Sequence, residues 1–269
     1  MGIRLNNDHV EKYRADGYLI LDKPLFPPPR FDALKARFEM LIENWQQTMD
    51  KSPEHIVGPH LFDPKMFDWL MDDAILDLIE PLIGPDIGIF SSQFLCKPAG
   101  VGKVVPWHED ASYWRDKLQP VTVCTVWIAI DPSTRDNGCM RVIPGTHLNA
   151  GRQHHEVPDR SKSALSYGID VQTINESKAV DCVLEENQCS LHDADLVHGS
   201  NANTSDRRRC GYNIRYFPTS VKVSESFQFK TYLARGKDRG GNQYGDPTRI
   251  NNAWLETAPE YRKLCRLIR

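Results

Sequence analysis

The sequence predicts an α+β, mainly β fold, in which a β-sandwich or barrel is braced on one side by helices. Apolar side chains recur at helical spacing through most of the first ninety residues. From Ile87 onward, short β-rich runs are separated by Gly, Pro and Asn. Helices first and strands after is an order typical of α+β domains, and 269 residues are enough for one closed β domain.

Residues 1–86 are expected to be mostly helical support for the β core. The expected elements are a helix N-capped by Asn7 and ended by Gly17, a strand at 18–21, a stiff connector at Pro27–Pro29, a helix at 31–48, and a helix at 65–83 opened by Pro64. The 31–48 helix carries one apolar stripe, which indicates that this helix packs on the core.

Residues 87–220 are expected to form the β core of a single domain that spans 1–269. The clearest predicted strands are 89–97, 101–107, 121–131 and 208–217. Residues 149–178 form a polar, aperiodic insert, too long for a simple connection, and this favours either a functional lid or a disordered segment. Residues 221–269 are a C-terminal extension.

Side chains alternate between the two faces of a strand, so parity indicates which of them share a face. The polar faces carry Ser91, Gln93 and Lys97 in one strand, Thr125 and Trp127 in another, and Arg209, Gly211, Asn213 and Arg215 in a third. The opposite faces carry residues such as Phe90, Phe94, Cys96, Cys210 and Tyr212. Several polar faces together favour a barrel whose lumen is the active site over strands exposed to solvent.

Charge and composition disfavour several classes of partner. The net charge is −3, and basic residues cluster only at Arg207–Arg209, so neither nucleic acid nor a membrane surface is an expected partner. No apolar stretch approaches membrane-spanning length, and the N-terminus lacks the apolar region of a signal peptide. The seven cysteines include no C-x-x-C pair, so a reducing cytoplasm is the default expectation.

The most informative pattern is His108-Glu109-Asp110 followed by His198-Gly199-Ser200 and, eleven residues after His198, by Arg209. Two imidazoles and one carboxylate can hold one face of Fe(II) and leave three positions open. A guanidinium offers a fork of donors that suits the far carboxylate of a keto-diacid. A His-x-Asp triplet alone is a weak signal, but it ends a predicted strand and aromatic residues flank it.

These residues closely resemble the phytanoyl-CoA dioxygenase family of Fe(II)/2-oxoglutarate oxygenases. The resemblance covers about residues 8 to 220. Its motifs are Lys97-Pro98, Trp107-His108-Glu109-Asp110, the run Asn137–His147, His198-Gly199-Ser200, Asn203 and Arg207–Arg209, in the family's order.

The resemblance implies a double-stranded β-helix, the jelly-roll fold of cupin-like proteins. It implies Fe(II), with 2-oxoglutarate as cosubstrate and O₂, and a hydroxylation that releases succinate and CO₂. It implies His108, Asp110 and His198 as the iron ligands. It implies Arg209 and Ser200 as ligands of the 2-oxoglutarate C5 carboxylate. Halogenating relatives carry Ala or Gly at the carboxylate position, so Asp110 disfavours halogenation.

Three further residues fall where related enzymes contact 2-oxoglutarate: Gln93, Thr125 and Trp127. For these three, packing in the lumen is an equally good interpretation. His192 is six residues before His198, and a role behind the metal ligands or in its strand is favoured over metal binding. The triplet His154-His155-Glu156 lies in the polar insert, where a solvated loop is expected.

The substrate is only weakly indicated. Arg215 shares the predicted lumen face with Arg209, so it could bind an anionic substrate group or pair with an acidic neighbour. Tyr113 and Trp114 could cover an apolar or cationic group, and His60 could face the pocket. The expected substrate is a small anionic or zwitterionic metabolite, such as an aminoalkylphosphonate or an amino-acid-like compound.

Several alternatives stay open. An acyl-CoA or a natural-product scaffold is less favoured as substrate, because no basic patch is visible for the CoA phosphates. A cupin-like metalloenzyme that does not use 2-oxoglutarate is disfavoured by Arg209 and Ser200. A non-catalytic binding module is disfavoured by the intact triad. The oligomeric state is expected to be monomer or homodimer.

Overall fold

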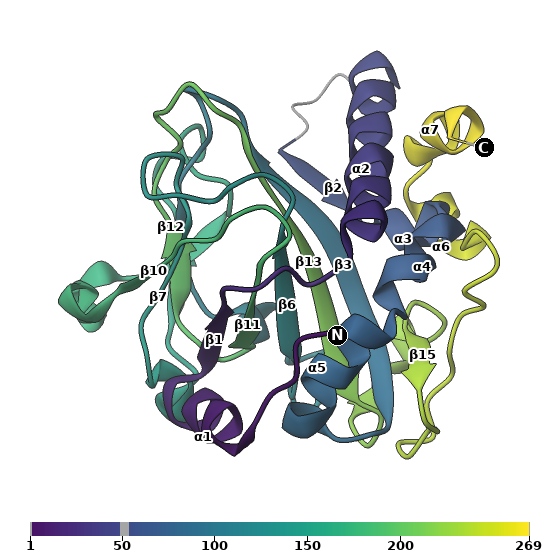
Figure 1. The fold of residues 1–269 in the computed structure, drawn as a ribbon, viewed down its shortest axis with the longest axis horizontal. Coiled ribbons are helices and arrows are strands. Elements are labelled where there is room, and N and C mark those ends of the chain that lie inside the picture. The colour runs from purple at the N-terminus through teal and green to yellow at the C-terminus, as the bar shows by residue number, and fades with distance from the viewer. Residues whose placement is uncertain (1, 49–53, 269) are drawn as a thin grey trace.

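The computed structural model describes residues 2–48 and 54–268, so residues 1, 49–53 and 269 of the expected domain lie outside the described residues. Figure 1 shows a larger β-sheet in the centre, a smaller sheet to its left, most of the helices to its right, and the helix of residues 7–16 at the lower left. The predicted β-sandwich or barrel with helices on one side is confirmed.

The larger sheet has seven strands, and all its pairings are antiparallel. In spatial order it contains β1 (Tyr18–Leu21), β11 (Cys189–Asp193), β6 (Cys124–Ala129), β13 (Arg209–Pro218), β3 (Ile87–Lys97) and β15 (Tyr232–Arg235), with β2 (His55–Val57) also paired to β3.

The smaller sheet has four strands and carries the histidines of the predicted metal site. Its order is β10 (Val180–Cys182), β7 (Met140–Val142), β12 (His198–Ser200) and β4 (Val105–His108). Two further pairs are β5 (Leu118–Gln119) with β14 (Lys222–Val223), and β8 (His154–Glu156) with β9 (Tyr167–Ile169). Together the sheets form the double-stranded β-helix that the sequence resemblance implied.

The helices gather at the two ends of the chain. They are α1 (Asn7–Asp16), α2 (Pro28–Thr48), α3 (Pro59–Phe62), α4 (Phe67–Leu70), α5 (Asp73–Ile83), α6 (Asn252–Thr257) and α7 (Tyr261–Leu267). Short 3₁₀ turns lie at Pro64–Met66, Asp110–Tyr113 (η2), Thr146–Asn149, Val171–Thr173, Glu176–Lys178 (η5) and Glu225–Phe227.

Three predictions about the helices were wrong in detail. The N-cap of α1 is Asn6, whose side chain accepts a 2.9 Å hydrogen bond from the His9 backbone N–H. Pro28 and Pro29 open α2 instead of forming a connector, because proline lacks only an N–H that the first helical turn leaves unbonded anyway. The single helix expected at 65–83 is broken, since Asp72 caps a new helix by accepting from Ala74 N.

The apolar stripe of α2 packs on the outer face of the larger sheet. Phe31, Leu34, Phe38, Leu41 and Trp45 are all buried there. Phe38 and Phe94 of β3 have ring centroids 4.9 Å apart, and Phe94 stacks on Tyr212 of β13 at 4.2 Å. This core holds the larger sheet in place while its other face remains available for a site.

The strand register defines the inward rows of that sheet. Ser91, Arg215, Thr125 and His192 lie opposite one another across neighbouring strands, and Gln93, Asn213, Trp127 and Ser190 form the next row. Because partners across a ladder point to the same face, the polar face predicted from parity is confirmed as one continuous surface.

Phe90 is the exception to the parity prediction. The register of β3 against β13 shifts between Arg215 and Tyr216, which leaves Phe90 as the extra residue of a β-bulge. Beyond the bulge, side chains change faces, so Phe90 lies on the inner side instead of beside Phe94. There it packs against Trp114, with ring centroids 5.2 Å apart.

The insert at 149–178 is structured. It contains the hairpin β8–β9 and two 3₁₀ turns, and its residues Ala164 and Leu165 reach the central cavity. The prediction of a solvated loop at His154 was wrong, since His154 lies in β8 and accepts a 3.1 Å hydrogen bond from Glu109 N.

Among the described residues, no helix combines the length and the apolar character needed to cross a membrane.

Replacing Phe38 by alanine is expected to lower the free energy of unfolding by about 3–5 kcal/mol, because it leaves a cavity between α2 and the sheet. Denaturant unfolding measures this change. The matched control is Phe229→Ala, where a 56% exposed ring is removed and a change within about 0.5 kcal/mol is expected. Equal effects of the two substitutions would contradict the assignment of Phe38 to the core.

Candidate active site

Pairing of β12 with β4 brings the two histidines of the motif together. His198 lies opposite His108 in the register, and their ring centroids are 4.1 Å apart. Asp110 begins the 3₁₀ turn η2, two residues after His108. All three side chains are buried, and their candidate ligand atoms lie within 4.8 Å of one another. The structure therefore assembles a three-residue group that could hold a metal ion.

Both imidazoles have the same hydrogen bond to the backbone. His108 Nδ1 lies 2.9 Å from Pro106 O, and His198 Nδ1 lies 2.9 Å from Leu196 O. A carbonyl oxygen can only accept, so Nδ1 carries the proton and the lone pair of Nε2 is free. Burial, and then the neighbouring His108 and His192, lower the pKa of His198 well below its usual value, which keeps its ring neutral.

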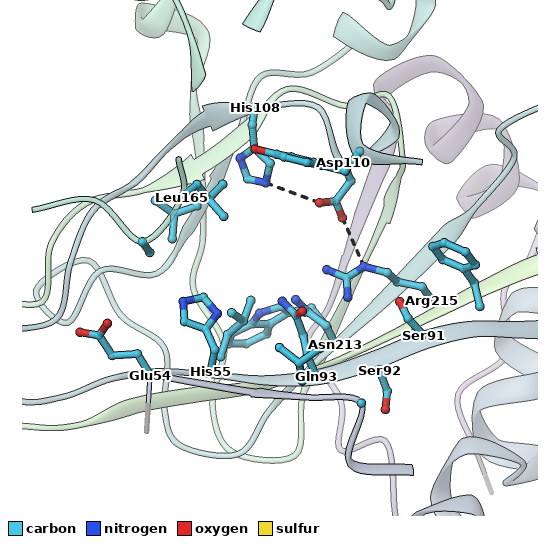
Figure 2. A pocket seen from close by; sticks show the side chains of 18 of the residues that line it. Glu54, His55, Ser91, Ser92, Gln93, His108, Asp110, Leu165, Asn213 and Arg215 are labelled. Atoms are coloured by element: carbon cyan, nitrogen blue, oxygen red, sulfur yellow. Dashed lines mark ion pairs between the residues drawn. The ribbon is translucent and has the colours of Figure 1, made fainter. Parts of the chain in front are cut away.

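Asp110 lies between a histidine and an arginine, as Figure 2 shows. Its Oδ1 is 3.5 Å from His108 Nε2, and its Oδ2 is 3.5 Å from Arg215 Nε. Burial opposes ionisation of Asp110, but the charge of Arg215 outweighs it and holds the pKa of the carboxyl well below its usual range. Asp110 is therefore a carboxylate at neutral pH, and Arg215 lies where it can hold that carboxylate in orientation.

Arg209 is buried without an acidic partner within 4.0 Å among the described residues. Its Nη2 donates to Gly138 O at 2.7 Å. Its Nε has no hydrogen-bond partner among the described residues. The guanidinium lies 5.5 Å from the centre of the Trp127 ring, and a Cβ on Gly211 would lie 2.0 Å from that ring. Glycine at 211 thus leaves room for the indole beside the arginine.

Lys97 lies directly opposite Arg209 in the register. Its Nζ donates to Lys103 O at 2.7 Å and also to Asn201 O. Burial, and next the charge of Arg209, lower the pKa of Lys97 to about 6. Two basic side chains lie together in a buried place, and among the described residues neither has a carboxylate within 4.0 Å, so this environment favours an anion.

One cavity of about 480 Å³ joins these groups. Figure 2 shows Gln93, Asn213 and Arg215 on one wall, His108 and Asp110 across from them, and His55 and Leu165 toward one end. The predicted site residues that line it are His108, Asp110, His198, Arg209, Ser200, Gln93, Trp127, Arg215, Trp114, Tyr113 and His60.

Two of the predicted residues lie differently from the rest. Thr125 is fully buried between Arg215 and His192 in the register and is not part of the cavity lining. His60 comes from α3, and its Nδ1 lies 2.7 Å from the hydroxyl of Ser92 on the opposite face of β3. Burial lowers the pKa of His60 to about 3, so this ring is neutral.

The sequence assigned no role to two residues that the structure brings to the cavity, Lys97 and Asn213, and for His192 it favoured a role behind the metal ligands or in its strand. Strand parity placed Lys97 and Asn213 on the correct face, which was the available signal. His192 has a ring centroid 4.7 Å from that of His198, and neither of its nitrogens has a hydrogen-bond partner within the described ranges. Its proximity depends on the pairing of β11 with β6, which local sequence does not encode.

The fold and the site together define a class. A double-stranded β-helix with two histidines and one carboxylate at the cavity, and room beside them, is the arrangement of non-haem iron oxygenases. Comparison with known proteins then gives the family. The phytanoyl-CoA dioxygenase family model matches residues 13–211, and the chain belongs to that family.

Relatives of known name are moderately similar. The peroxisomal phytanoyl-CoA dioxygenase of Mus musculus is 30% identical over 208 residues, which cover 74% of this chain and 58% of that protein. A phytanoyl-CoA dioxygenase domain-containing protein 1 homolog of Caenorhabditis elegans is 29% identical over 58% of this chain and 56% of its own length. The chain thus spans little more than half of these relatives.

Solved structures share the fold over nearly the whole chain. The non-heme monooxygenase ThoJ superposes with a TM-score of 0.75 at 25% identity, covering 96% of this chain and 98% of that one. EctD from S. alaskensis, solved with 2-oxoglutarate and 5-hydroxyectoine, gives a TM-score of 0.69 at 20% identity over 92% of this chain and 86% of that one. The fold that the sequence resemblance implied is therefore confirmed.

Substituting alanine for Gly211 is expected to displace the Trp127 indole and to lower the free energy of unfolding by about 1–3 kcal/mol, as overpacking does. Denaturant unfolding measures the loss. In a Trp127→Ala background the same glycine substitution should cost much less, because the obstructing ring is gone. An equal cost in both backgrounds would show that the two residues are not in contact.

Proposed function

We propose that this protein is an Fe(II)- and 2-oxoglutarate-dependent dioxygenase that hydroxylates a C–H bond of a small anionic or zwitterionic metabolite. One observation carries the proposal: a buried arginine without an acidic partner in the described chain lines the same cavity as a His-Asp-His group. The histidines and the carboxylate suit a metal, and the arginine suits an acid that binds beside it.

The three candidate ligands, His108, Asp110 and His198, fit Fe(II). Both histidines have a free Nε2 lone pair, and Asp110 is ionised at neutral pH. Imidazole and carboxylate are ligands that iron accepts, and three protein ligands leave positions open for other molecules. The carboxylate of Asp110 also favours hydroxylation over halogenation.

The residues around Arg209 fit 2-oxoglutarate. Its guanidinium has an unused Nε, Lys97 adds a second basic group, and the Ser200 hydroxyl lies on the same cavity. Trp127 and Gln93 line the cavity on the larger sheet, from the row next to Arg215. We assign the far carboxylate of the keto-diacid to Arg209 and Ser200, with Gln93 and Trp127 as further contacts. For Thr125, which does not line the cavity, contact with 2-oxoglutarate stays a prediction.

When bound, iron together with 2-oxoglutarate and O₂ supplies the oxidation of a C–H bond, with release of succinate and CO₂. The protein's own residues do the positioning. Arg215 orients the Asp110 carboxylate, and the carbonyls of Pro106 and Leu196 fix the two imidazole rings. The aromatic wall formed by Phe90, Trp114 and Phe227 keeps that side of the cavity dry.

The size of the cavity supports a small substrate. Its volume of about 480 Å³ has to hold the cosubstrate as well as the substrate. Ser91 and Asn213 offer hydrogen bonds, and the guanidinium of Arg215 favours an anionic group. Tyr113, Trp114 and His60 also line the cavity as candidate substrate contacts.

A second candidate substrate is an acyl-CoA or a natural-product scaffold. The apolar lining supplied by Phe90, Phe227 and Trp254 would suit an acyl chain or a ring system. The mouse relative is named phytanoyl-CoA dioxygenase, and a relative from Bordetella bronchiseptica, 23% identical over 75% of this chain and 71% of that protein, is named ectoine dioxygenase. Both substrate classes therefore occur among the relatives.

A cytoplasmic location, a single domain and a monomeric or homodimeric state stay predictions.

Anaerobic addition of Fe(II) and 2-oxoglutarate to the apoprotein is expected to produce a visible charge-transfer band. The band should be lost in His108→Ala. In Arg209→Ala the apparent Kd of 2-oxoglutarate should rise about 10- to 100-fold, since a hydrogen bond to a charged group contributes about 1.5–3 kcal/mol.

The matched control for Arg209 is Arg207→Ala, because Arg207 lies on the surface and pairs with Asp136. This variant should bind 2-oxoglutarate as the wild type does. If a folded, metal-loaded wild-type protein gave no band at any 2-oxoglutarate concentration, the proposed use of 2-oxoglutarate would be wrong.

Candidate substrates can be compared by the succinate that they cause to be released. We expect small amino acids, aminoalkylphosphonates and similar zwitterions to raise succinate release well above the substrate-free rate, and long-chain acyl-CoA not to do so. His108→Ala is the blank for non-enzymatic loss of 2-oxoglutarate. Stimulation by acyl-CoA alone would favour the second candidate.

A further inference from the structure

Glu109, the middle residue of the His-x-Asp triplet, has a carboxylate that is fully buried and yet is not part of the cavity lining. Among the described residues, this carboxylate accepts hydrogen bonds from three donors, all at the start of the insert at 149–178. They are Gly151 N at 3.0 Å, Arg152 N at 3.2 Å and Arg152 Nη1 at 2.7 Å. The insert therefore neutralises a charge that lies between the two candidate metal ligands of β4 and η2.

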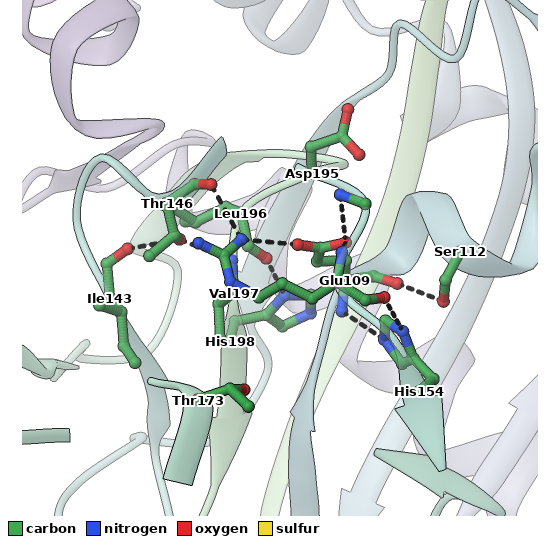
Figure 3. A network of polar contacts seen from close by, with 12 residues as sticks. Glu109, Ser112, Ile143, Thr146, His154, Thr173, Asp195, Leu196, Val197 and His198 are labelled. Atoms are coloured by element: carbon green, nitrogen blue, oxygen red, sulfur yellow. Dashed lines mark hydrogen bonds and ion pairs between the residues drawn. The ribbon is translucent and has the colours of Figure 1, made fainter. Parts of the chain in front are cut away.

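Through Thr146, Arg152 is also linked to the backbone just before the second ligand-bearing strand, β12. Its Nη1 donates to Thr146 O at 3.1 Å, and Thr146 Oγ1 accepts a 2.9 Å hydrogen bond from Val197 N. Val197 directly precedes His198. Figure 3 shows this network, which runs from His154 and Glu109 to Thr146 and Val197. One arginine thus connects the backbone beside Asp110 and His108 with the backbone beside His198.

The insert is attached at further points beside the site. Trp107 Nε1, next to His108, donates to Glu176 Oε1 in η5. Ala164 N donates to Val104 O at 2.8 Å, and Ala164 and Leu165 form part of the cavity wall. The same segment therefore covers the cavity and contacts the chain next to the ligands.

We propose that Arg152 is a positioning residue for the metal site, and that through Glu109 and Thr146 it couples attachment of the insert to metal binding. Neither Arg152 nor Glu109 lines the cavity, so both act through other residues. Because coupling between two equilibria is reciprocal, metal binding tightens attachment of the insert as much as attachment strengthens metal binding. The inference rests on the metal site of the proposed function, but not on 2-oxoglutarate or on the substrate.

Co(II) titration of the apoprotein tests the coupling, with the visible d–d bands reporting both affinity and coordination. Arg152→Gln is expected to weaken Co(II) binding at least tenfold and to change the band shape, because groups behind metal ligands typically alter affinity about 10- to 100-fold. Arg152→Lys keeps a charge for Glu109 and should restore part of the affinity. Arg160→Gln, which removes an exposed ion pair with Glu156 in the same insert, is the matched control and should match the wild type.

Limited trypsin digestion measures the reverse effect. Arg160 and Lys162 are exposed in the insert and provide cleavage sites, with side chains 58% and 83% accessible. Co(II) is expected to slow cleavage there several-fold in the wild type, and to slow it much less in Arg152→Gln at saturating metal. Equal protection in both proteins would contradict the coupling.

A folded Arg152→Gln protein that binds Co(II) as the wild type does, with the same bands, would overturn the inference. If that variant fails to fold, Thr146→Val takes its place. This variant keeps the ion pair of Arg152 with Glu109 and removes the hydroxyl that accepts from Val197 N and donates to Ile143 O. Weaker Co(II) binding by Thr146→Val supports the inference, and unchanged binding overturns it. Failure of the wild type to bind Co(II) would instead contradict the metal site of the proposed function itself.

Discussion

The antiparallel pairing of β12 with β4 is the interaction on which the site depends. It puts His198 opposite His108, ninety residues away in sequence, with ring centroids 4.1 Å apart. Each ring is fixed by a carbonyl two residues before it, so both Nε2 atoms keep a free lone pair. The short turn after β4 adds Asp110, and the alternation of the chain sends Glu109 away from the cavity toward the insert. One pairing therefore sets both the metal group and its outer support.

The larger sheet supplies the complementary part of the site through two arginines with different surroundings. Arg209 lies near Lys97 and has no carboxylate within 4.0 Å in the described chain, an environment that favours binding of an acid. Arg215 lies 3.5 Å from Asp110 and also lines the cavity, so it contacts an acidic neighbour and the space open to a substrate. The pairing of Arg215 with an acidic neighbour, one of the two interpretations weighed from sequence, is therefore observed, and its binding of a substrate anion stays a prediction.

The sequence patterns predicted the longest strands, β3, β6 and β13, and the polar inner face, because side-chain alternation is a local property that survives folding. They failed where a single residue changes the geometry. The bulge at Phe90 changes which face of the sheet each following side chain occupies. Asp72 caps a new helix within a segment where the apolar spacing predicted one continuous helix. The hairpin β8–β9 was also missed, since its strands have three residues each and are too short to show alternation.

The sequence by itself determined the chemistry of the ligands: two histidines, one carboxylate and a following arginine, in an order that resembles one family. The spacing within each motif is short, so its side chains share a face whatever surrounds them. Only the tertiary structure decided that Lys97 lies beside Arg209, that His192 approaches His198, and that Arg152 is joined to Glu109. These contacts depend on pairing between strands and on packing of the insert. Such long-range pairings form because they bury apolar surface over the whole domain, and residues adjacent in sequence do not specify them.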